Sequence, residues 1–329
     1  MLALRRQLAP GARGLEIGAH TRPVGGLTPF FTDAVATFAG SAGRVDFLSD
    51  ALALPLPDAC LDYLCSSHVL EHLPATLAAL HEWHRVLRPG GWLYLVVPDQ
   101  RYTFDAARAT TLTPHFLSDF LAGVTTAGSA AHVDEFVDRV DWSRLRPACL
   151  ADQHAADRET CRRSYHAQLR AGLPIDLHFH TFTPDSLRAL LRAAGFIGSP
   201  RARFETVVET ERYPPDRIDG IAFLLRKRPA DAPTAEPATV ALPHADAAIP
   251  PLPLVCPATL APLHLSVAPD GSRSLTVAGS GRAYCHRGDL PVLLPLPGTP
   301  VRRPWTSRAW RLSHHLTDRL RLAFSPRSA

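Results

Sequence analysis

The sequence predicts an α/β protein built around a doubly wound, mostly parallel sheet. Its clearest feature is the stretch 61–99, where two apolar runs of strand length, 61–66 and 92–97, flank a helical pattern over 74–87. A strand, a helix and a strand joined by short connections form a βαβ unit, whose two strands are parallel. Both runs are apolar throughout, which is typical of strands that are covered on both faces.

Shorter segments on either side of this unit predict the other strands. A helix is expected to begin at Thr183-Pro184-Asp185, which supplies an N-cap, a proline for the first turn and a carboxylate that complements the helix dipole. Together the strands form a seven-stranded sheet. They are predicted over residues 14–18, 29–33, 44–50, 61–66, 92–97, 204–211 and 221–228.

The composition narrows the class of protein. With 329 residues, 46% of them hydrophobic, the chain is long enough for one large domain and a smaller unit. Its net charge of +4 does not indicate a nucleic-acid-binding protein. The six cysteines contain no CxxC pair, so neither a disulfide framework nor a zinc site is indicated. Because no signal peptide or membrane-spanning segment is recognised, we expect a cytoplasmic protein.

Polar residues at the predicted strand ends are candidates for ligand binding. In open α/β sheets, ligands bind beyond the carboxyl ends of the parallel strands. Glu16 and Gly18 end the first strand, and Asp33 ends the second, where a carboxylate can accept from both hydroxyls of a ribose. The alternative is that Asp33 caps a helix over 34–38. The GxGxxG fingerprint is absent, which argues against NAD.

Residues 14–99 resemble the class I S-adenosylmethionine-dependent methyltransferases, and the likeness extends to residue 228. Four motifs follow in the family's order: LEIG, an acid after the second strand, SDALALPLPDACLDYLCSSHVLEHL and HRVLRPGGWLYLVVPD. The resemblance implies a Rossmann-like domain whose last strand is antiparallel to the rest, with S-adenosyl-L-methionine as cofactor. The chain departs from the family at Ala19-His20-Thr21-Arg22, where further small residues are usual, and the helix between the first two strands is nearly missing.

The resemblance also implies roles for residues at consecutive strand ends. The acid and glycine of the first strand would line the methionine and ribose side of the cofactor, and the acid after the second would bind the ribose hydroxyls. An Asp-Ala pair after the third strand would bracket the adenine, and a Ser-Ser-His segment after the fourth would close the floor near the sulfonium. These residues are Glu16, Gly18, Asp33, Asp50, Ala51, Ser66, Ser67 and His68.

The acceptor side is expected in an insertion over residues 100–182. A hydroxyl acceptor needs a base, worth about 10²–10⁴ in rate, and our candidate catalytic residues are Asp99, Arg101, His178 and His180. The two histidines alternate on a predicted strand and share one face. No third ligand is identifiable beside them, so no metal is expected.

Two more histidines lie in the segment HVLEHL. His72 is interpreted as a packing residue at the start of the helix, and His68 as either catalytic or packing.

A subset of the family linked to cell-surface polysaccharides has similar IGxxxRP and VPDxRYTFD segments, and this chain has both. That likeness implies a hydroxyl of a sugar or another small molecule as the methyl acceptor.

We divide the chain into a methyltransferase domain over 1–228, an Ala/Pro-rich linker over 229–253, a small β module over 254–298 and a basic tail over 299–329. The module is similar to the zinc-ribbon activators of tRNA- and rRNA-modifying methyltransferases. Of their four metal ligands only Cys256 remains, so we expect a metal-free module that packs or docks a protein partner. The tail is interpreted as a docking helix or a frayed end rather than a membrane-surface helix.

The sequence therefore predicts an S-adenosylmethionine-dependent methyltransferase that O-methylates a sugar or another small-molecule hydroxyl. The first alternative is an RNA or protein methyltransferase, which the ribbon-like module suggests. Against it, Ser66-Ser67-His68-Val69 stands where enzymes that methylate exocyclic amines have Asn/Asp-Pro-Pro-Tyr/Phe. The second alternative is a non-catalytic cofactor-binding scaffold, which the altered glycine turn suggests.

Overall fold

The structure is a computed structural model, and most of the chain up to residue 294 is described. The predicted basic tail over 299–329 and much of the predicted linker lie outside the described residues. The described ranges are 2–38, 41–125, 128–173, 175–229, 240–268, 272–280, 282–287 and 290–294.

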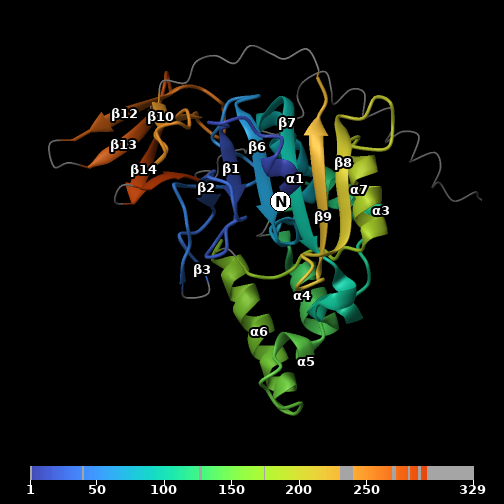
Figure 1. Ribbon diagram of the computed structural model, residues 1–329. Helices are drawn as coiled ribbons and strands as arrows, with labels where there is room; N and C mark the ends of the chain where they lie inside the picture. Colours follow the sequence, from blue (N-terminus) through green and yellow to red (C-terminus); the bar gives the residue numbers. More distant parts are fainter. Residues whose placement is uncertain are drawn as a thin grey trace, which may run out of the picture.

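A largely parallel sheet forms the centre of the molecule (Figure 1). Seven of its strands lie in the order β5-β2-β1-β6-β7-β9-β8; the first five are parallel, and β9 is antiparallel to both of its neighbours. This arrangement confirms the predicted fold class. The strands are β1 (Gly14–Ile17), β2 (Phe30–Asp33), β5 (Phe47–Ser49), β6 (Leu61–Ser67), β7 (Leu87–Pro98), β8 (Phe204–Tyr213) and β9 (Gly220–Lys227).

The predicted βαβ unit is present as β6, α2 (Thr76–Val86) and β7. Leu77, Leu80 and Trp83 of α2 are buried, as the helical spacing of the apolar residues requires. The helix ends at Val86, and β7 begins at the next residue, so the connection is as short as the sequence indicates. A short 3-10 helix, η1 (Leu70–His72), lies between β6 and α2.

Helices cover the two faces of the sheet unequally. One face packs under α2, α3 (Thr113–Ala122) and α7 (Pro184–Ala193), which form the largest hydrophobic core with β1, β6 and β7. The other face is covered by the short α1 (Leu2–Arg5) and by Val24 of the β1–β2 connection. That connection contains no helix, as expected.

Thr183 caps α7 through a capping box, which confirms the predicted helix start.

The insertion forms a helical lobe beyond the carboxyl ends of the parallel strands (Figure 1). It has a hydrophobic core of its own, built from α4, α6 and residues 175–179. No strand is assigned over residues 175–180, so the predicted strand at His178 and His180 is wrong: the backbone hydrogen bond there runs from Phe179 N–H to the Glu71 carbonyl, not to a neighbouring strand. The other elements of the lobe are η2 (Gln100–Tyr102), η3 (Phe104–Ala107), α4 (Ala130–Arg139), α5 (Trp142–Leu145) and α6 (Gln153–Arg170).

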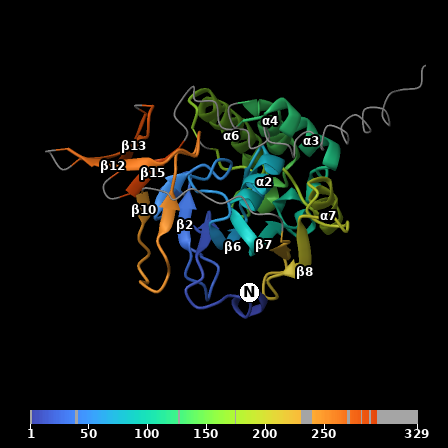
Figure 2. The same ribbon diagram turned by 90° about the horizontal axis from the view of Figure 1, so that it is seen from above.

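The C-terminal strands extend the central sheet instead of standing apart from it (Figure 2). β15 pairs in parallel with β5, so that Val292 lies opposite Leu48, and the whole sheet has eleven strands. A small hairpin, β3 (Thr37–Phe38) with β4 (Ser41–Ala42), follows β2. The C-terminal strands are β10 (Val240–Leu242), β11 (Leu252–Leu254), β12 (Leu263–Val267), β13 (Arg273–Val277), β14 (Ala283–Arg287) and β15 (Leu290–Leu293).

Among the described residues, no helix combines the length and the apolar character needed to cross a membrane.

Candidate functional site

Four of the predicted cofactor residues lie at the carboxyl ends of adjacent parallel strands. Ile17 of β1 lies opposite both Thr32 of β2 and Ser66 of β6. The residues that follow these three, namely Gly18, Asp33 and Ser67, therefore come level at one edge of the sheet. Asp50 follows the end of β5, the next strand along.

Glu16 and Gly18 shape the turn after β1. The Glu16 carboxylate is buried; Oε1 accepts a hydrogen bond of 2.8 Å from the Val24 N–H, and Oε2 has no partner. Burial raises the pKa of Glu16 to about 7. Gly18 has a φ of +69°, and a Cβ there would lie 2.5 Å from Val69 Cγ2. The glycine is thus required both by backbone conformation and by the close approach of the segment after β6.

Asp33 and Asp50 each accept from the backbone two residues ahead. Asp33 Oδ1 lies 3.3 Å from the Val35 N–H, and Asp50 Oδ1 lies 2.8 Å from the Leu52 N–H. Burial raises the pKa of both carboxyls. No helix begins after Asp33, so the alternative of a helix cap is wrong; a two-residue strand follows at 37–38.

Ser66, Ser67 and His68 form the end of β6 and its exit. Ser66 is fully buried, and its hydroxyl has no hydrogen-bond partner, which is unusual for a buried polar group. His68 has a φ of +57° and is held by a 3.0 Å bond from its N–H to the Val96 carbonyl. Ala51, which follows the end of β5, is buried, and its carbonyl accepts from Trp83 Nε1 at 3.1 Å.

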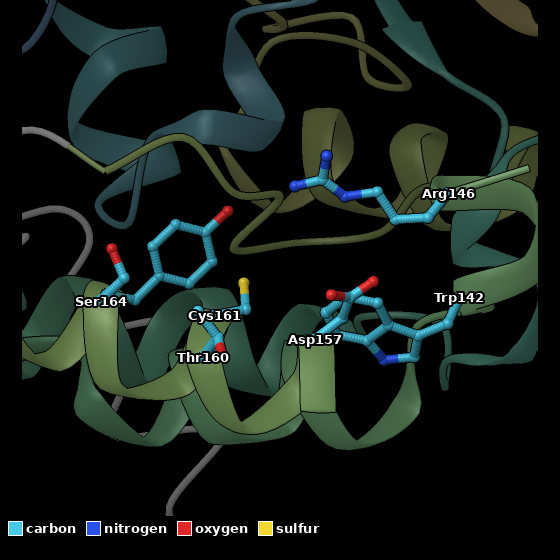
Figure 3. Close-up of a pocket in the computed structure, with 7 residues that line it drawn as sticks. Trp142, Arg146, Asp157, Thr160, Cys161 and Ser164 are labelled. Atoms are coloured by element: carbon cyan, nitrogen blue, oxygen red, sulfur yellow. The ribbon is translucent and has the colours of Figure 1, made fainter. Parts of the chain in front are cut away.

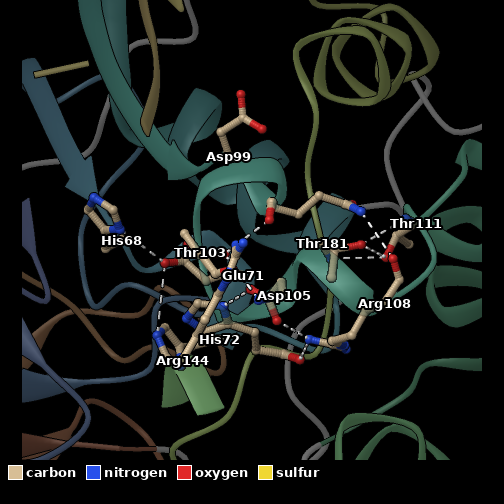
Figure 4. Close-up of polar contacts among 12 residues, drawn as sticks. His68, Glu71, His72, Asp99, Thr103, Asp105, Arg108, Thr111, Arg144 and Thr181 are labelled. Carbon is tan, nitrogen blue, oxygen red and sulfur yellow. Dashed lines mark hydrogen bonds and ion pairs between the residues drawn. The ribbon is translucent and has the colours of Figure 1, made fainter. Parts of the chain in front are cut away.

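Asp99 and Arg101 are engaged with each other. Asp99 is buried at the end of β7, and its two carboxylate oxygens accept from the Arg101 guanidinium at 2.6–3.1 Å. The Arg101 side chain also reaches Glu211 at 3.4 Å. The Asp99 carboxylate points away from the polar cluster below it (Figure 4). The structure thus separates this pair from the predicted catalytic histidines.

Glu71, which our sequence analysis did not single out, lies at the centre of that polar cluster. It is fully buried, and neither carboxylate oxygen has a hydrogen-bond partner. Oε1 lies 3.7 Å from His68 Nδ1 and 3.9 Å from His72 Nε2. Burial raises the pKa of Glu71 to about 7, and burial lowers the pKa of His68 to about 4 and of His72 to about 3. The sequence signal that could have identified Glu71 is an acidic residue between two histidines, shortly after a predicted strand.

His178 belongs to the same cluster through a buried ion pair. Its Nδ1 lies 2.5 Å from Asp105 Oδ2, and Arg108 binds the other Asp105 oxygen at 2.8 Å (Figure 4). Burial alone would lower the pKa of His178, but the hydrogen bond and charge of Asp105 more than offset it and raise that pKa. His178 is therefore engaged by a buried carboxylate rather than free to act on an acceptor.

His180 lies in a different cluster. Its Nε2 lies near the Pro74 carbonyl and Asp119 Oδ2, and its ring packs edge-on against those of His115 and His132. The structure thus divides the four predicted catalytic residues among three places. Asp99 and Arg101 pair with each other, His178 joins Glu71, and His180 joins two helices of the insertion.

A well-defined cavity lies elsewhere in the described chain. It has a volume of about 240 Å³ and is formed between α5 and α6, away from the strand ends (Figure 3). Trp142 and Arg146 line one side, and residues of α6 line the other. The cavity is lined by none of the predicted site residues.

Comparison with known proteins places a methyltransferase match on this sheet. Residues 31–95 match the family model described as a methyltransferase domain. The segment runs from β2 through β6 and α2 into β7 and carries Asp33, Asp50 and Glu71. The match over residues 31–95 supports the sequence prediction of an S-adenosylmethionine-dependent methyltransferase.

The relatives agree with this match. A probable S-adenosylmethionine-dependent methyltransferase of Mycolicibacterium smegmatis is 42% identical over 84 residues, which is 25% of this chain and 32% of the relative. Methyltransferase GfsG of Streptomyces halstedii is 32% identical over 122 residues, covering 37% and 42% of the two chains. The chain thus spans about a third to two fifths of the length of these curated relatives.

A solved structure, described as a possible histamine N-methyltransferase of Thermotoga maritima, aligns over 69% of this chain and 87% of its own, at 18% identity and a TM-score of 0.36.

Proposed function

We propose that the protein is an S-adenosylmethionine-dependent methyltransferase whose acceptor is a hydroxyl of a sugar or another small molecule. One observation carries the first half of the proposal. Polar groups suited to a nucleoside stand at consecutive carboxyl ends of strands in the order β5-β2-β1-β6, within or beside the segment that matches a methyltransferase domain. The acceptor class is supported by the IGxxxRP and VPDxRYTFD segments, which resemble those of the methyltransferase subset linked to cell-surface polysaccharides.

The proposed cofactor site runs along this edge. Asp33 would accept from the ribose hydroxyls, and Asp50 with Ala51 would bracket the adenine. Gly18 lets the segment after β6 approach the turn closely, and the unpartnered hydroxyl of Ser66 is a buried polar group of the kind that a ligand satisfies. S-adenosylmethionine would supply the methyl group and leave as S-adenosylhomocysteine.

We assign the acceptor side to His68 and Glu71. His68 is one-third exposed at the strand end, and its lowered pKa leaves it neutral and able to accept the acceptor's proton. As the acceptor oxygen forms its bond to the methyl carbon and the carbon–sulfur bond breaks, that proton passes to the imidazole. Glu71 lies 3.7 Å behind His68 and is the positioning residue whose carboxylate stabilises the imidazolium.

Isothermal titration with S-adenosylmethionine tests the cofactor site. We expect Asp33→Asn to weaken binding about tenfold to a hundredfold, since hydrogen bonds to charged groups contribute about 1.5–3 kcal/mol. The matched control is Asp216→Asn, an exposed aspartate of the turn between β8 and β9, which should bind as the unmodified chain does. Unchanged affinity in Asp33→Asn would contradict the proposed pocket, and absence of binding in the unmodified chain would contradict the function.

The acceptor is tested by turnover with nucleotide-sugars and polysaccharide fragments, followed through formation of S-adenosylhomocysteine. Binding of the cofactor without turnover on any acceptor would favour the scaffold alternative. With a working acceptor, Glu71→Gln should lower kcat and leave cofactor affinity unchanged. A normal kcat in that variant would remove Glu71 from the proposed mechanism.

We also propose that the C-terminal module docks within the same chain. β15 covers the edge of β5, whose end carries Asp50, and the Val255 N–H bonds the Pro55 carbonyl at 2.9 Å. Leu263, Leu275 and Tyr284 share the main hydrophobic core. These contacts support a module that holds the adenine side of the site in place.

A further inference from the structure

Three helical and loop segments of the insertion bring a second group of polar side chains together, apart from the proposed cofactor site. His115 and Asp119 lie one turn apart on α3, His132 lies on α4, and His180 lies in the extended segment before α7. One candidate ligand atom from each of the four residues lies within 4.8 Å of those of the other three.

Hydrogen bonds among these side chains leave the group incompletely satisfied. His115 Nε2 and His132 Nε2 are 3.0 Å apart, and Asp119 Oδ2 lies 3.2 and 3.3 Å from these two nitrogens. Yet Asp119 Oδ2 is buried without a partner in hydrogen-bonding geometry, and so is Nδ1 of the fully buried His180. Buried polar atoms that lack partners need an explanation, and an ion at their centre supplies one.

The spacing fits a small tetrahedral ion. Four ligands at about 2.0–2.1 Å from a tetrahedral zinc ion lie roughly 3.3–3.4 Å from one another. The observed separations of 3.0, 3.2 and 3.3 Å among His115, Asp119 and His132 match this value. His180 would supply the fourth ligand through its unpartnered Nδ1, since its Nε2 faces the Pro74 carbonyl.

We propose that His115, Asp119, His132 and His180 form a structural site for a divalent zinc ion. Three imidazoles and one carboxylate suit zinc, whereas calcium and magnesium prefer oxygen ligands alone. Four protein ligands fill a tetrahedral shell, which is typical of structural sites and leaves no position for a substrate. The ion would join α3 and α4 of the lobe to the segment that leads into α7.

The outer contacts of the group agree with this assignment. His180 Nε2 lies 3.1 Å from the Pro74 carbonyl, an outer contact of the kind that orients a ligating histidine. The His115 side chain is about half exposed, at 49%, which provides an entry path for the ion.

A second group, formed by Glu71, His72 and His178, carries no such assignment. Its His178 Nδ1 is already engaged by Asp105 Oδ2 at 2.5 Å, and Arg108 binds the other oxygen of that carboxylate. With His178 committed to this contact, the two remaining side chains are too few for a stable site.

Metal analysis of the full chain, purified without a polyhistidine tag, tests the proposal. We expect about one zinc ion per chain after equilibration with Zn²⁺ and gel filtration. Replacement by Co²⁺ should give the intense visible absorption of a tetrahedral cobalt site. Asp119→Asn and His132→Asn should each weaken Zn²⁺ binding more than about a hundredfold, because loss of outer contacts alone costs 10–100-fold.

The matched control is His166→Asn, a histidine of the same lobe that pairs with Asp134 at 2.9 Å and lies outside the group. It should retain one zinc ion per chain. A chelator should lower the Tm of the unmodified chain and of His166→Asn, and should not change that of a folded Asp119→Asn variant. Substoichiometric zinc in the unmodified chain, or full zinc in both Asp119→Asn and His132→Asn, would overturn the proposal. These outcomes do not depend on methyl transfer.

Discussion

Glu71 is the residue whose environment most strongly predicts a measurable pH effect. Its pKa rises from 4.5 in a solvent-exposed chain to about 7 in the folded protein, because the carboxyl is fully buried. Between these values the folded state holds a proton that the unfolded state has released, so the free energy of unfolding falls as pH rises. The loss is complete above about pH 7 and amounts to about 3 kcal/mol at 1.36 kcal/mol per unit.

Glu71→Gln removes this titration and should therefore gain stability relative to the unmodified chain as pH rises. Chemical denaturation at a series of pH values should show the difference growing by about 3 kcal/mol between pH 4.5 and pH 7 and levelling above that. Glu205→Gln, at an exposed position on β8, should show no such trend. A difference that is constant with pH in Glu71→Gln would mean that the buried carboxyl is not protonated in the folded state.

Individual residues show how far sequence reasoning reaches. The cap at Thr183 is a local signal, because its partner Ser186 lies three residues away, and the structure confirms it. Glu71 gave only a local hint, because its neighbours His178 and Asp105 come from distant segments. The same limit applies to His180: its companions His115 and His132 lie on helices whose packing no local pattern reveals.

β15 is the element that joins the C-terminal strands to the main sheet. Its Leu293 is fully buried in the main core and pairs with Ser49 of β5. Leu293→Ala should lower the free energy of unfolding by about 2–5 kcal/mol, the usual range for a buried leucine. Leu265→Ala, on β12 at 53% exposure, should change it by less than about 0.5 kcal/mol.

Denaturation by urea, followed by circular dichroism, compares the two leucine variants. Equal, small losses would mean that the C-terminal strands contribute little to the stability of the sheet. A separate early transition in Leu293→Ala would mean that they unfold on their own.

The elements differ in how well the sequence predicts them. β6 and β7 are long apolar runs, and α2 between them is periodic. β6 and α2 lie within two residues of their predicted bounds, whereas β7 begins at Leu87 instead of residue 92. The pairing of β15 with β5 joins residues far apart in the chain, and such a contact leaves no trace in either segment. The strand expected at 175–180 failed for a related reason: its alternation reflects contacts with the lobe and with η1, not with a neighbouring strand.

At the scale of the whole molecule, the described residues form three hydrophobic cores. Two lie on opposite faces of the sheet, and the third belongs to the lobe that lies beyond the strand ends. The mostly parallel, seven-stranded sheet was predicted from the succession of motifs. The lobe's separate core was not, because residues 100–182 hold several short helices whose packing partners are each other.

A lobe with its own core should open independently of the sheet. Val137 on α4 is fully buried in that third core, and Val137→Ala should weaken it by about 2 kcal/mol. Native-state hydrogen exchange should then show faster exchange in α4 and α6, with β6 and β7 unchanged. Val97→Ala, fully buried in β7, should instead speed exchange throughout the sheet. If Val137→Ala speeds exchange equally in β6 and β7, the lobe and the sheet form one cooperative unit, and access to the strand ends cannot depend on the lobe opening alone.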